Sequence, residues 1–121
     1  MLMKNELDIY NYNFILTKVI DADTLEGSID LGFKMNIVKI RIRVAGIDAP
    51  EVRGKEKIEG LKAKDYVISA LSDNPIKIKS YYYDSFGRII ADVYYLNKQL
   101  NEWLNLSLEL LKQDLVKAYV K

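Results

Sequence analysis

The chain has 121 residues, half of them hydrophobic and 29% charged, which is the composition of one folded domain, expected over residues 1–121. Its formal charge of +1 lacks the basic excess that is usual in nucleic-acid binders. It has no Cys and no His, which excludes disulfides, thiolate nucleophiles, Cys/His zinc sites and a Ser-His-Asp triad. A catalytic base would therefore be a carboxylate, and a bound metal would have oxygen ligands, as Ca²⁺ or Mg²⁺ does.

The sequence contains no targeting or membrane signal that we can identify. No segment has the roughly 20 apolar residues of a transmembrane helix. The stretch from Met1 to Asn13 carries Lys4, Glu6 and Asp8 and lacks the apolar centre of a signal peptide. We expect a protein that is cytoplasmic, or secreted with its signal removed, and a monomer without a membrane or a stable protein partner.

Three strands are predicted in the first half of the chain. Residues 14–20 are rich in β-forming side chains, a weaker signal covers residues 24–31, and residues 31–34 are typical of a hairpin connection. The clearest strand is 35–44, because its aliphatic and cationic residues alternate. We expect one face of this strand to be apolar, with Val38, Ile40, Ile42 and Val44, and the other to be cationic, with Lys39, Arg41 and Arg43.

The second half begins with a predicted amphipathic helix over residues 55–72, whose apolar positions are Ile58, Leu61, Val67, Ile68 and Leu71. Residues 76–83 and 88–96 then predict a second hairpin across the turn 84–87. From residue 100 onward, helical spacing is expected from Trp103, Leu104, Leu108, Leu111 and Leu115. Within the run Tyr81-Tyr82-Tyr83, we expect Tyr82 to pack inward and its two neighbours to face the other way.

This order of elements predicts a mainly β fold with helices. It matches a five-stranded OB-fold barrel with one helix between the third and fourth strands and a C-terminal helical segment. An α+β sandwich could share the same order. Tyrosines that remain exposed on such a barrel could stack on bases, although filling the core is their more common use.

Carboxylates gather where the predicted strands end. Asp21 and Asp23 lie where the first strand passes into the second, and Asp48 and Glu51 follow the third. Aspartates at such places often only cap turns, and a glutamate in a loop is often only a solvated side chain. If an ion binds here, we expect one of Asp21 and Asp23 to serve it and the other to do structural work.

The chain uses arginine sparingly. It contains four arginines, Arg41, Arg43, Arg53 and Arg88, against 14 lysines. Planar bidentate contact with phosphate is one reason to use arginine, and a salt bridge or stacking on tyrosine is the alternative for Arg43 and Arg88. Residues 34–64 hold nine Lys and Arg against four Asp and Glu, a local charge of +5 that we expect to lie where a phosphate would arrive.

Three blocks of sequence resemble the staphylococcal nuclease (thermonuclease-like) family in order and spacing. They are Val19-Ile-Asp-Ala-Asp-Thr24, Arg43-Val-Ala-Gly-Ile-Asp48-Ala-Pro-Glu51 and Asp84-Ser-Phe-Gly-Arg88, and the resemblance extends from about residue 14 to Tyr119. It implies an OB-fold and a Ca²⁺-dependent phosphodiesterase, a nuclease that hydrolyses DNA and RNA.

The resemblance also implies roles for individual residues. The metal would be bound by Asp23, Asp48 and the backbone carbonyl of Ala49, and Asp21 would lie beside it. The remaining roles are a general base at Glu51, guanidinium groups on the phosphate at Arg43 and Arg88, and contacts to the nucleotide at Phe86 and Tyr119.

The chain departs from the family pattern in three of these places. Ala49 replaces the usual Thr, Ala22 replaces Gly, and Phe86 replaces Tyr. Two other functions remain open: an inactive module of this family that binds nucleic acid or a protein partner, and a plain OB-fold protein that binds single strands. The presence of both metal carboxylates, the base and both arginines favours the enzyme.

Overall fold

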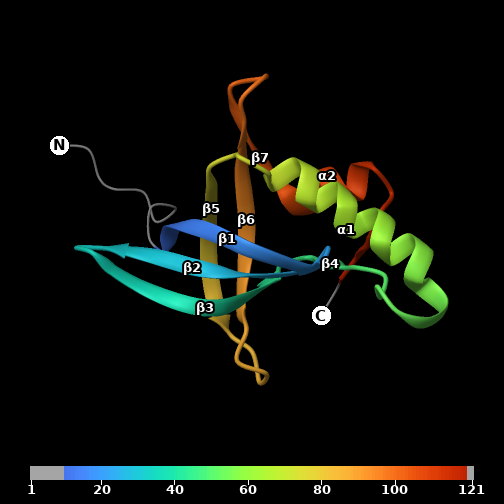
Figure 1. Ribbon diagram of the computed structural model, residues 1–121, viewed down its shortest axis with the longest axis horizontal. Coiled ribbons are helices and arrows are strands. Elements are labelled where there is room, and N and C mark those ends of the chain that lie inside the picture. Colours follow the sequence, from blue (N-terminus) through green and yellow to red (C-terminus); the bar gives the residue numbers. More distant parts are fainter. Residues whose placement is uncertain (1–9, 120–121) are drawn as a thin grey trace.

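The computed structural model describes residues 10–119, which form a strongly bent sheet with two helices packed at one end (Figure 1). The strands are β1 (Asn11–Asp21), β2 (Thr24–Gly32), β3 (Met35–Val44), β4 (Ile47–Asp48), β5 (Ile76–Tyr83), β6 (Ile89–Asn97), β7 (Glu102–Asn105) and β8 (Lys117–Ala118). The helices are α1 (Lys57–Leu71), which follows a 3₁₀ turn at Gly54–Glu56, and α2 (Leu106–Lys112). Residues 1–9, where a signal peptide was not expected, lie outside the described residues.

Five of the strands close into a barrel. The hydrogen-bonded order is β3-β2-β1-β5-β6-β7, and β3 also pairs in parallel with β6, which joins the two ends of the five-strand set. The closing register places Ile42 opposite Ile89 and Val44 opposite Ala91. This closed arrangement of β1, β2, β3, β5 and β6, with α1 between β3 and β5, confirms the predicted OB-fold. Neither helix of the described chain is both long and apolar enough to cross a membrane.

The core fills the barrel and the space beneath the helices. Strand β6 shows the pattern most clearly, since its buried and half-buried residues alternate along the whole strand. Its buried positions are Ile89, Ala91, Val93 and Tyr95. Gly27 of β2 has no room for a side chain, because a Cβ there would lie 2.1 Å from the carbonyl oxygen of Ile15 in β1. The close approach of β1 and β2 therefore depends on glycine.

A bulge in β3 corrects the expected apolar face. Ile42 and Val44 are fully buried and Ile40 is half-buried, as predicted, but Val38 is 66% exposed. Gly27 of β2 pairs with Ile40 and Ile29 pairs with Ile37, so β3 contains one residue more than β2 in this stretch. Lys39, which lies inside the bulge, has a positive φ of 53°. This extra residue reverses the faces of the strand beyond it, so Ile37 turns toward the core in place of Val38.

A second bulge explains why the inward placement of Tyr82 is wrong. Ser80 pairs with Ala91 and Tyr82 pairs with the next residue back, Ile90, so Tyr81 is an extra residue on β5. Ile90 belongs to the outer positions of β6, and the bulge thus brings Tyr82 to the outer face as well. Both tyrosines are 51% exposed.

Helix α1 lies where it was predicted, but only Val67 and Leu71 of its five expected apolar positions are buried. Ile58, Leu61 and Ile68 are exposed, and the buried stripe is Gly60, Ala63, Val67 and Leu71. Small residues at the start of this stripe let the helix backbone approach the loop that follows β4. A Cβ at Gly60 would lie 2.0 Å from the backbone oxygen of Glu51 and 2.9 Å from the Cα of Val52. Close backbone contact, rather than the size of the side chains, therefore sets the buried face.

The C-terminal region is only partly helical. Trp103 and Leu104 belong to β7, which extends the sheet beyond β6, so the helical spacing expected from them is wrong. Helix α2 starts at Leu106 because Asn105 caps it, with its side chain accepting the N–H of Leu108 at 3.1 Å. Beyond the helix, β8 returns the chain to pair with β4.

We predict that Gly60→Ala lowers the free energy of unfolding by about 1–3 kcal/mol, because the new methyl group overpacks the contact with the Glu51 backbone. In an open helix the same change would stabilise by up to about 1 kcal/mol. Urea unfolding measures the difference, with Ser69→Ala at an exposed position of the same helix as the control. A Gly60→Ala protein as stable as the wild type would contradict the packing argument.

Candidate active site

The turn between β1 and β2 brings Asp21 and Asp23 together. Asp21 pairs with Thr24 across the two strands, so Ala22 and Asp23 form the turn itself. The backbone N–H of Asp23 donates to Oδ1 of Asp21 at 3.2 Å, and the hydroxyl of Thr24 donates to Oδ1 of Asp23 at 3.1 Å. Asp21 thus closes the turn, which is the structural work expected of one of the two carboxylates.

Asp23 ties this turn to the chain on both sides of β4. Its Oδ2 accepts the backbone N–H of Ala49 at 2.8 Å, and its carbonyl oxygen accepts the N–H of Val44 at 2.8 Å. The residue is buried, with 7% of its surface exposed. Residues 26 positions apart in sequence are therefore held in direct contact by one carboxylate.

The guanidinium of Arg43 occupies the centre of the site. Its Nη1 donates to the carbonyl oxygens of Val44 at 2.9 Å and Ile47 at 2.8 Å. Its Nη2 lies 3.5 Å from Oδ2 of Asp23 and 3.7 Å from Oδ1 of Asp48. The two carboxylates expected to bind a metal thus face the same guanidinium, which the backbone holds in place.

The charges of the aspartate pair differ. Burial alone would raise the pKa of Asp23, but hydrogen bonds with the Asp21 side chain and the N–H of Ala49, with the charge of Arg43, hold that pKa below its ordinary value. For Asp21, burial and the neighbouring Asp23 carboxylate raise the pKa to about 7. Asp23 therefore stays ionised at neutral pH and keeps a negative charge beside Arg43.

The end of the described chain also reaches this site. The backbone N–H of Tyr119 donates to the carbonyl oxygen of Gly46 at 2.9 Å, next to the pairing of β8 with β4. The centroid of the Tyr119 ring lies 5.8 Å from Cζ of Arg43, which is within the range of a cation–π contact. The structure thus places the late aromatic residue at the arginine expected to hold the phosphate.

Glu51 lies in an open groove of about 1070 Å³ beside this site. The groove runs between the loop after β4, helix α1 and residues 113–117, and Asp48 and Ala49 line it too. The side chain of Glu51 is exposed, and its backbone N–H donates to Oε1 of Glu56 at 3.3 Å. Asp48, Ala49 and Glu51 therefore border one space that solvent fills.

This groove is more acidic than the sequence led us to expect. Its charged lining residues are Asp48, Glu51, Glu56, Glu59, Asp65 and Asp114 against Lys62 and Lys117. Of the cations in residues 34–64, Lys62 alone is among them. The positive excess of that segment therefore does not gather in the groove beside Glu51.

Arg88 and Phe86 lie on a separate turn, between β5 and β6, which the side chain of Asp84 organises. Its Oδ1 accepts the N–H groups of Phe86 and Arg88, both at 2.9 Å, and its Oδ2 accepts Nε of Arg88 at 2.7 Å. Cζ of Arg88 lies 5.4 Å from the centroid of the Phe86 ring. Because Asp84 uses Nε, the two terminal nitrogens of Arg88 remain available for another acceptor.

The pairing of β3 with β6 relates the two arginines. Arg43 of β3 is opposite Ile90 of β6. Arg88 lies two residues before Ile90 in the chain, immediately before β6 begins. Both side chains therefore emerge on the outer face of the barrel, at neighbouring positions of adjacent strands. No direct contact between them occurs in residues 10–119 of the structure, so they form two sides of one region rather than one cluster.

Residues 41–121 match the family described as Staphylococcal nuclease homologue. The chain belongs to this family. The matched residues contain Arg43, Asp48, Glu51 and Arg88, whereas Asp23 precedes them and joins the site through the N–H of Ala49.

Three curated proteins are similar to this staphylococcal nuclease homologue. "Probable endonuclease LCL3" of Leptosphaeria maculans is 30% identical over 88 residues, which cover 70% of this chain and 29% of that protein. The protein of the same name from Phaeosphaeria nodorum is 32% identical over 90 residues, 69% of this chain and 29% of that one. "Probable staphylococcal-like nuclease CAN3" of Oryza sativa subsp. japonica is 34% identical over 64 residues, which cover 53% of this chain and 16% of that protein. The chain spans less than a third of each relative, and its single domain stays a prediction.

Two residues that position the site were given no role from the sequence, although Asp84 begins one of the three blocks quoted above. Gly60 lets α1 rest on the Glu51 backbone, and its signal was a glycine inside a helical pattern. Asp84 holds Arg88, and its signal was an aspartate four residues before an arginine across a Gly-containing turn.

We predict that Asp84→Asn lowers the free energy of unfolding by about 1 kcal/mol at pH 7, because the charged acceptor of Arg88 Nε is lost. Burial would raise the pKa of Asp84, but hydrogen bonds from Arg88 and Phe86 hold it below its ordinary value. This contribution is therefore present above the unfolded pKa of about 4 and disappears as the pH falls through the folded value.

Urea unfolding of both proteins at neutral and strongly acidic pH measures this difference. Asp73→Asn is the matched control, since Asp73 is exposed and has a φ of 59° that asparagine also adopts. A gap between Asp84→Asn and the wild type that widens on acidification would contradict the assigned role.

Proposed function

We propose that this staphylococcal nuclease homologue is a metal-dependent nuclease that hydrolyses phosphodiester bonds of DNA and RNA. The observation that carries the proposal is the position of Arg43, whose guanidinium is fixed by two backbone carbonyls and faces Asp23 and Asp48 beside the groove of Glu51. The names of the two fungal relatives favour endonucleolytic cleavage.

The donor atoms support a hard divalent cation. They are the carboxylates of Asp23 and Asp48 and the carbonyl oxygen of Ala49, with no nitrogen or sulfur in the set. No cluster of three acidic side chains suited to a metal exists among residues 10–119, so water and substrate oxygens would supply most of the roughly six to eight ligands of Ca²⁺. When bound, the cation would offset negative charge on the phosphate. The resemblance to the nuclease family favours Ca²⁺ over other divalent ions.

The side chains of the chain supply the rest of the chemistry. Glu51 takes a proton from water, the water oxygen bonds to phosphorus, and the bond from phosphorus to the leaving ester oxygen breaks. The leaving oxygen then takes a proton from solvent. Arg43 and Arg88 hold the phosphate oxygens by planar, bidentate contacts, and these become stronger as negative charge develops.

Binding of nucleic acid without cleavage is the second candidate function. The acidic lining of the groove favours it over cleavage, because Glu51 and five other carboxylates there oppose the approach of a polyanion to the proposed base. The presence of Asp23, Asp48, Glu51, Arg43 and Arg88 in one region favours the enzyme, since a binding module needs neither the base nor the metal carboxylates.

We predict that Glu51→Gln keeps affinity for an oligonucleotide and loses about 10²–10⁴-fold in turnover, because the amide cannot accept the proton of water. Cleavage of an end-labelled oligonucleotide measures turnover, and fluorescence anisotropy measures binding. Glu59→Gln changes another carboxylate that lines the same groove and serves as the control. Wild-type cleavage by Glu51→Gln would remove Glu51 from the mechanism.

We also predict that EDTA abolishes cleavage and that added Ca²⁺ restores it, because the phosphate charge is no longer offset without the cation. The same cleavage assay checks this, with Mg²⁺ and Mn²⁺ tested in parallel. Activity that persists in excess chelator would exclude the metal from the mechanism and leave the two arginines as the cationic groups.

A further inference from the structure

The outer surface of β5, β6 and β7 carries aromatic and lysine side chains at neighbouring positions. Lys77 pairs with Tyr94, Lys79 pairs with Asp92, and Trp103 pairs with Leu96. These residues occupy the half-buried or exposed positions of their strands, opposite to the core. We call the set Lys77, Lys79, Tyr81, Tyr94 and Trp103 the outer β5–β7 face.

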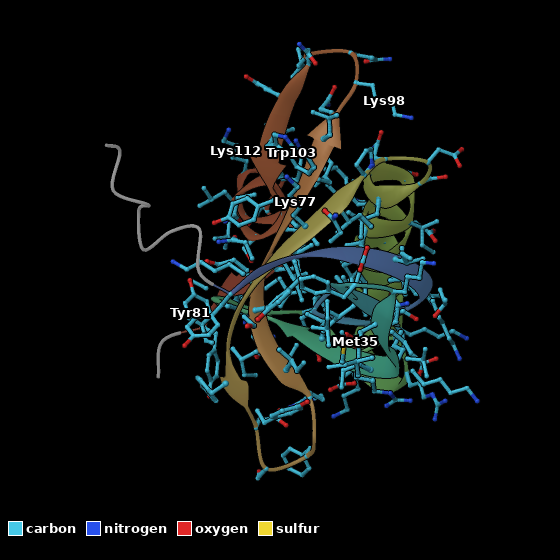
Figure 2. The ribbon with its side chains drawn as sticks, turned by 90° about the vertical axis from the view of Figure 1, so that its left-hand side faces the viewer. Met35, Lys77, Tyr81, Lys98, Trp103 and Lys112 are labelled. Atoms are coloured by element: carbon cyan, nitrogen blue, oxygen red, sulfur yellow. The ribbon has the colours of Figure 1, made fainter. Side chains whose placement is uncertain are left out.

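Two of the aromatic rings on this face each make a cation–π contact with a lysine and remain accessible to solvent. Nζ of Lys77 lies 4.9 Å from the centroid of the Trp103 ring, and Nζ of Lys79 lies 5.7 Å from that of Tyr81. Trp103 is 41% exposed and Tyr81 is 51% exposed. In Figure 2, Lys77 and Trp103 lie together on the side that faces the viewer, and Tyr81 lies further down. Supported, accessible rings next to cations are the elements of a stacking surface for bases.

Two carboxylates near this face have partners other than Lys77 and Lys79. Asp92 accepts the hydroxyl of Tyr81, and Glu109 forms an ion pair with Lys112 at 3.3 Å. That hydrogen bond and burial raise the pKa of Tyr81 to about 12, so the hydroxyl stays protonated and remains a donor. Neither Lys77 nor Lys79 has a carboxylate within salt-bridge distance among residues 10–119. Asp92 is the cross-strand partner of Lys79, whereas Lys77 is opposite Tyr94 and is the less compensated of the two cations.

Strand β6 joins this face to the candidate active site. Its outer positions are Ile90, Asp92, Tyr94 and Leu96, and Arg88 stands just before them on the same side. The distance from Arg88 to Leu96, which is opposite Trp103, is about 26 Å at about 3.3 Å per residue. The groove beside Glu51 is acidic, so a polyanion held at Arg88 is favoured along β6 rather than through that groove.

We propose that the outer β5–β7 face binds single-stranded nucleic acid, with bases stacked on Trp103 and Tyr81 and phosphates beside Lys77 and Lys79. The path of the nucleic acid along β6 to Arg88 rests on the proposed function, whereas its binding at the outer β5–β7 face does not. A duplex is not expected to bind in this way, because its base faces are already stacked inside the helix.

Trp103 is the only tryptophan of the chain, so its fluorescence reports directly on this face. In EDTA, so that nothing is cleaved, the protein is titrated with single-stranded oligothymidylate of about 12 nucleotides, within the site sizes of OB-folds. We expect saturable quenching of the tryptophan emission that weakens as salt is raised. A dinucleotide and a duplex of the same length should cause no quenching.

Lys77→Glu should weaken the affinity read from this quenching by about tenfold or more, and Trp103→Ala should weaken anisotropy-measured binding by about tenfold. The matched control is the double variant Phe33→Ala/Lys34→Glu, which makes the same two kinds of change in the turn between β2 and β3, where Phe33 is 97% exposed. Thermal unfolding verifies that each variant is folded.

Binding by anisotropy without quenching of Trp103, equal quenching by the duplex, or no binding at low salt would each overturn the proposed surface. The proposed function fails separately. Quenching that depends on Lys77, in a protein that cleaves no nucleic acid with any divalent ion, would support the surface and refute the nuclease.

Discussion

The guanidinium of Arg43 is the group on which the rest of the candidate site depends. Two of its hydrogen bonds go to backbone carbonyls of Val44 and Ile47, so the end of β3 and the start of β4 are fixed around it. Its other side faces Asp23 and Asp48, whose mutual repulsion it offsets. Without this cation, two carboxylates held near each other would push the β1–β2 turn away from the loop that carries Glu51.

Because backbone groups form much of this arrangement, the site accommodates alanine at positions 22 and 49, where the family pattern that the chain resembles has glycine and threonine. Ala49 offers its N–H to Asp23, and its carbonyl would serve the proposed metal; neither group depends on a threonine side chain. Ala22 is completely buried in the turn, where a methyl group fits without displacing Asp21 or Asp23. The charged residues differ in this respect, because only their side chains can supply the charge.

The sequence predicted the order of the barrel strands well, and it predicted the faces of the elements less well. Strand order depends on short-range signals such as runs of β-forming residues and turn residues, and these remained valid in the folded chain. Val38 and Tyr82 were placed wrongly because one inserted residue in a strand reverses every face beyond it. The buried face of α1 was predicted only in part, at Val67 and Leu71, because Gly60 is packed for its lack of a side chain, which a count of apolar residues does not register.

Net charge is the other property that an average over the chain misrepresents. The overall value of +1 divides in the folded protein into an acidic groove around Glu51 and an outer sheet face whose lysines form no salt bridge among residues 10–119. A polyanion is repelled from the groove and attracted along β6, so only the phosphate at Arg43 and Arg88 would come close to the carboxylates. A cation at Asp23 and Asp48 would lower that local repulsion most where the reacting phosphate lies. The acidic groove is thus compatible with a nuclease whose substrate crosses the edge of the groove instead of filling it.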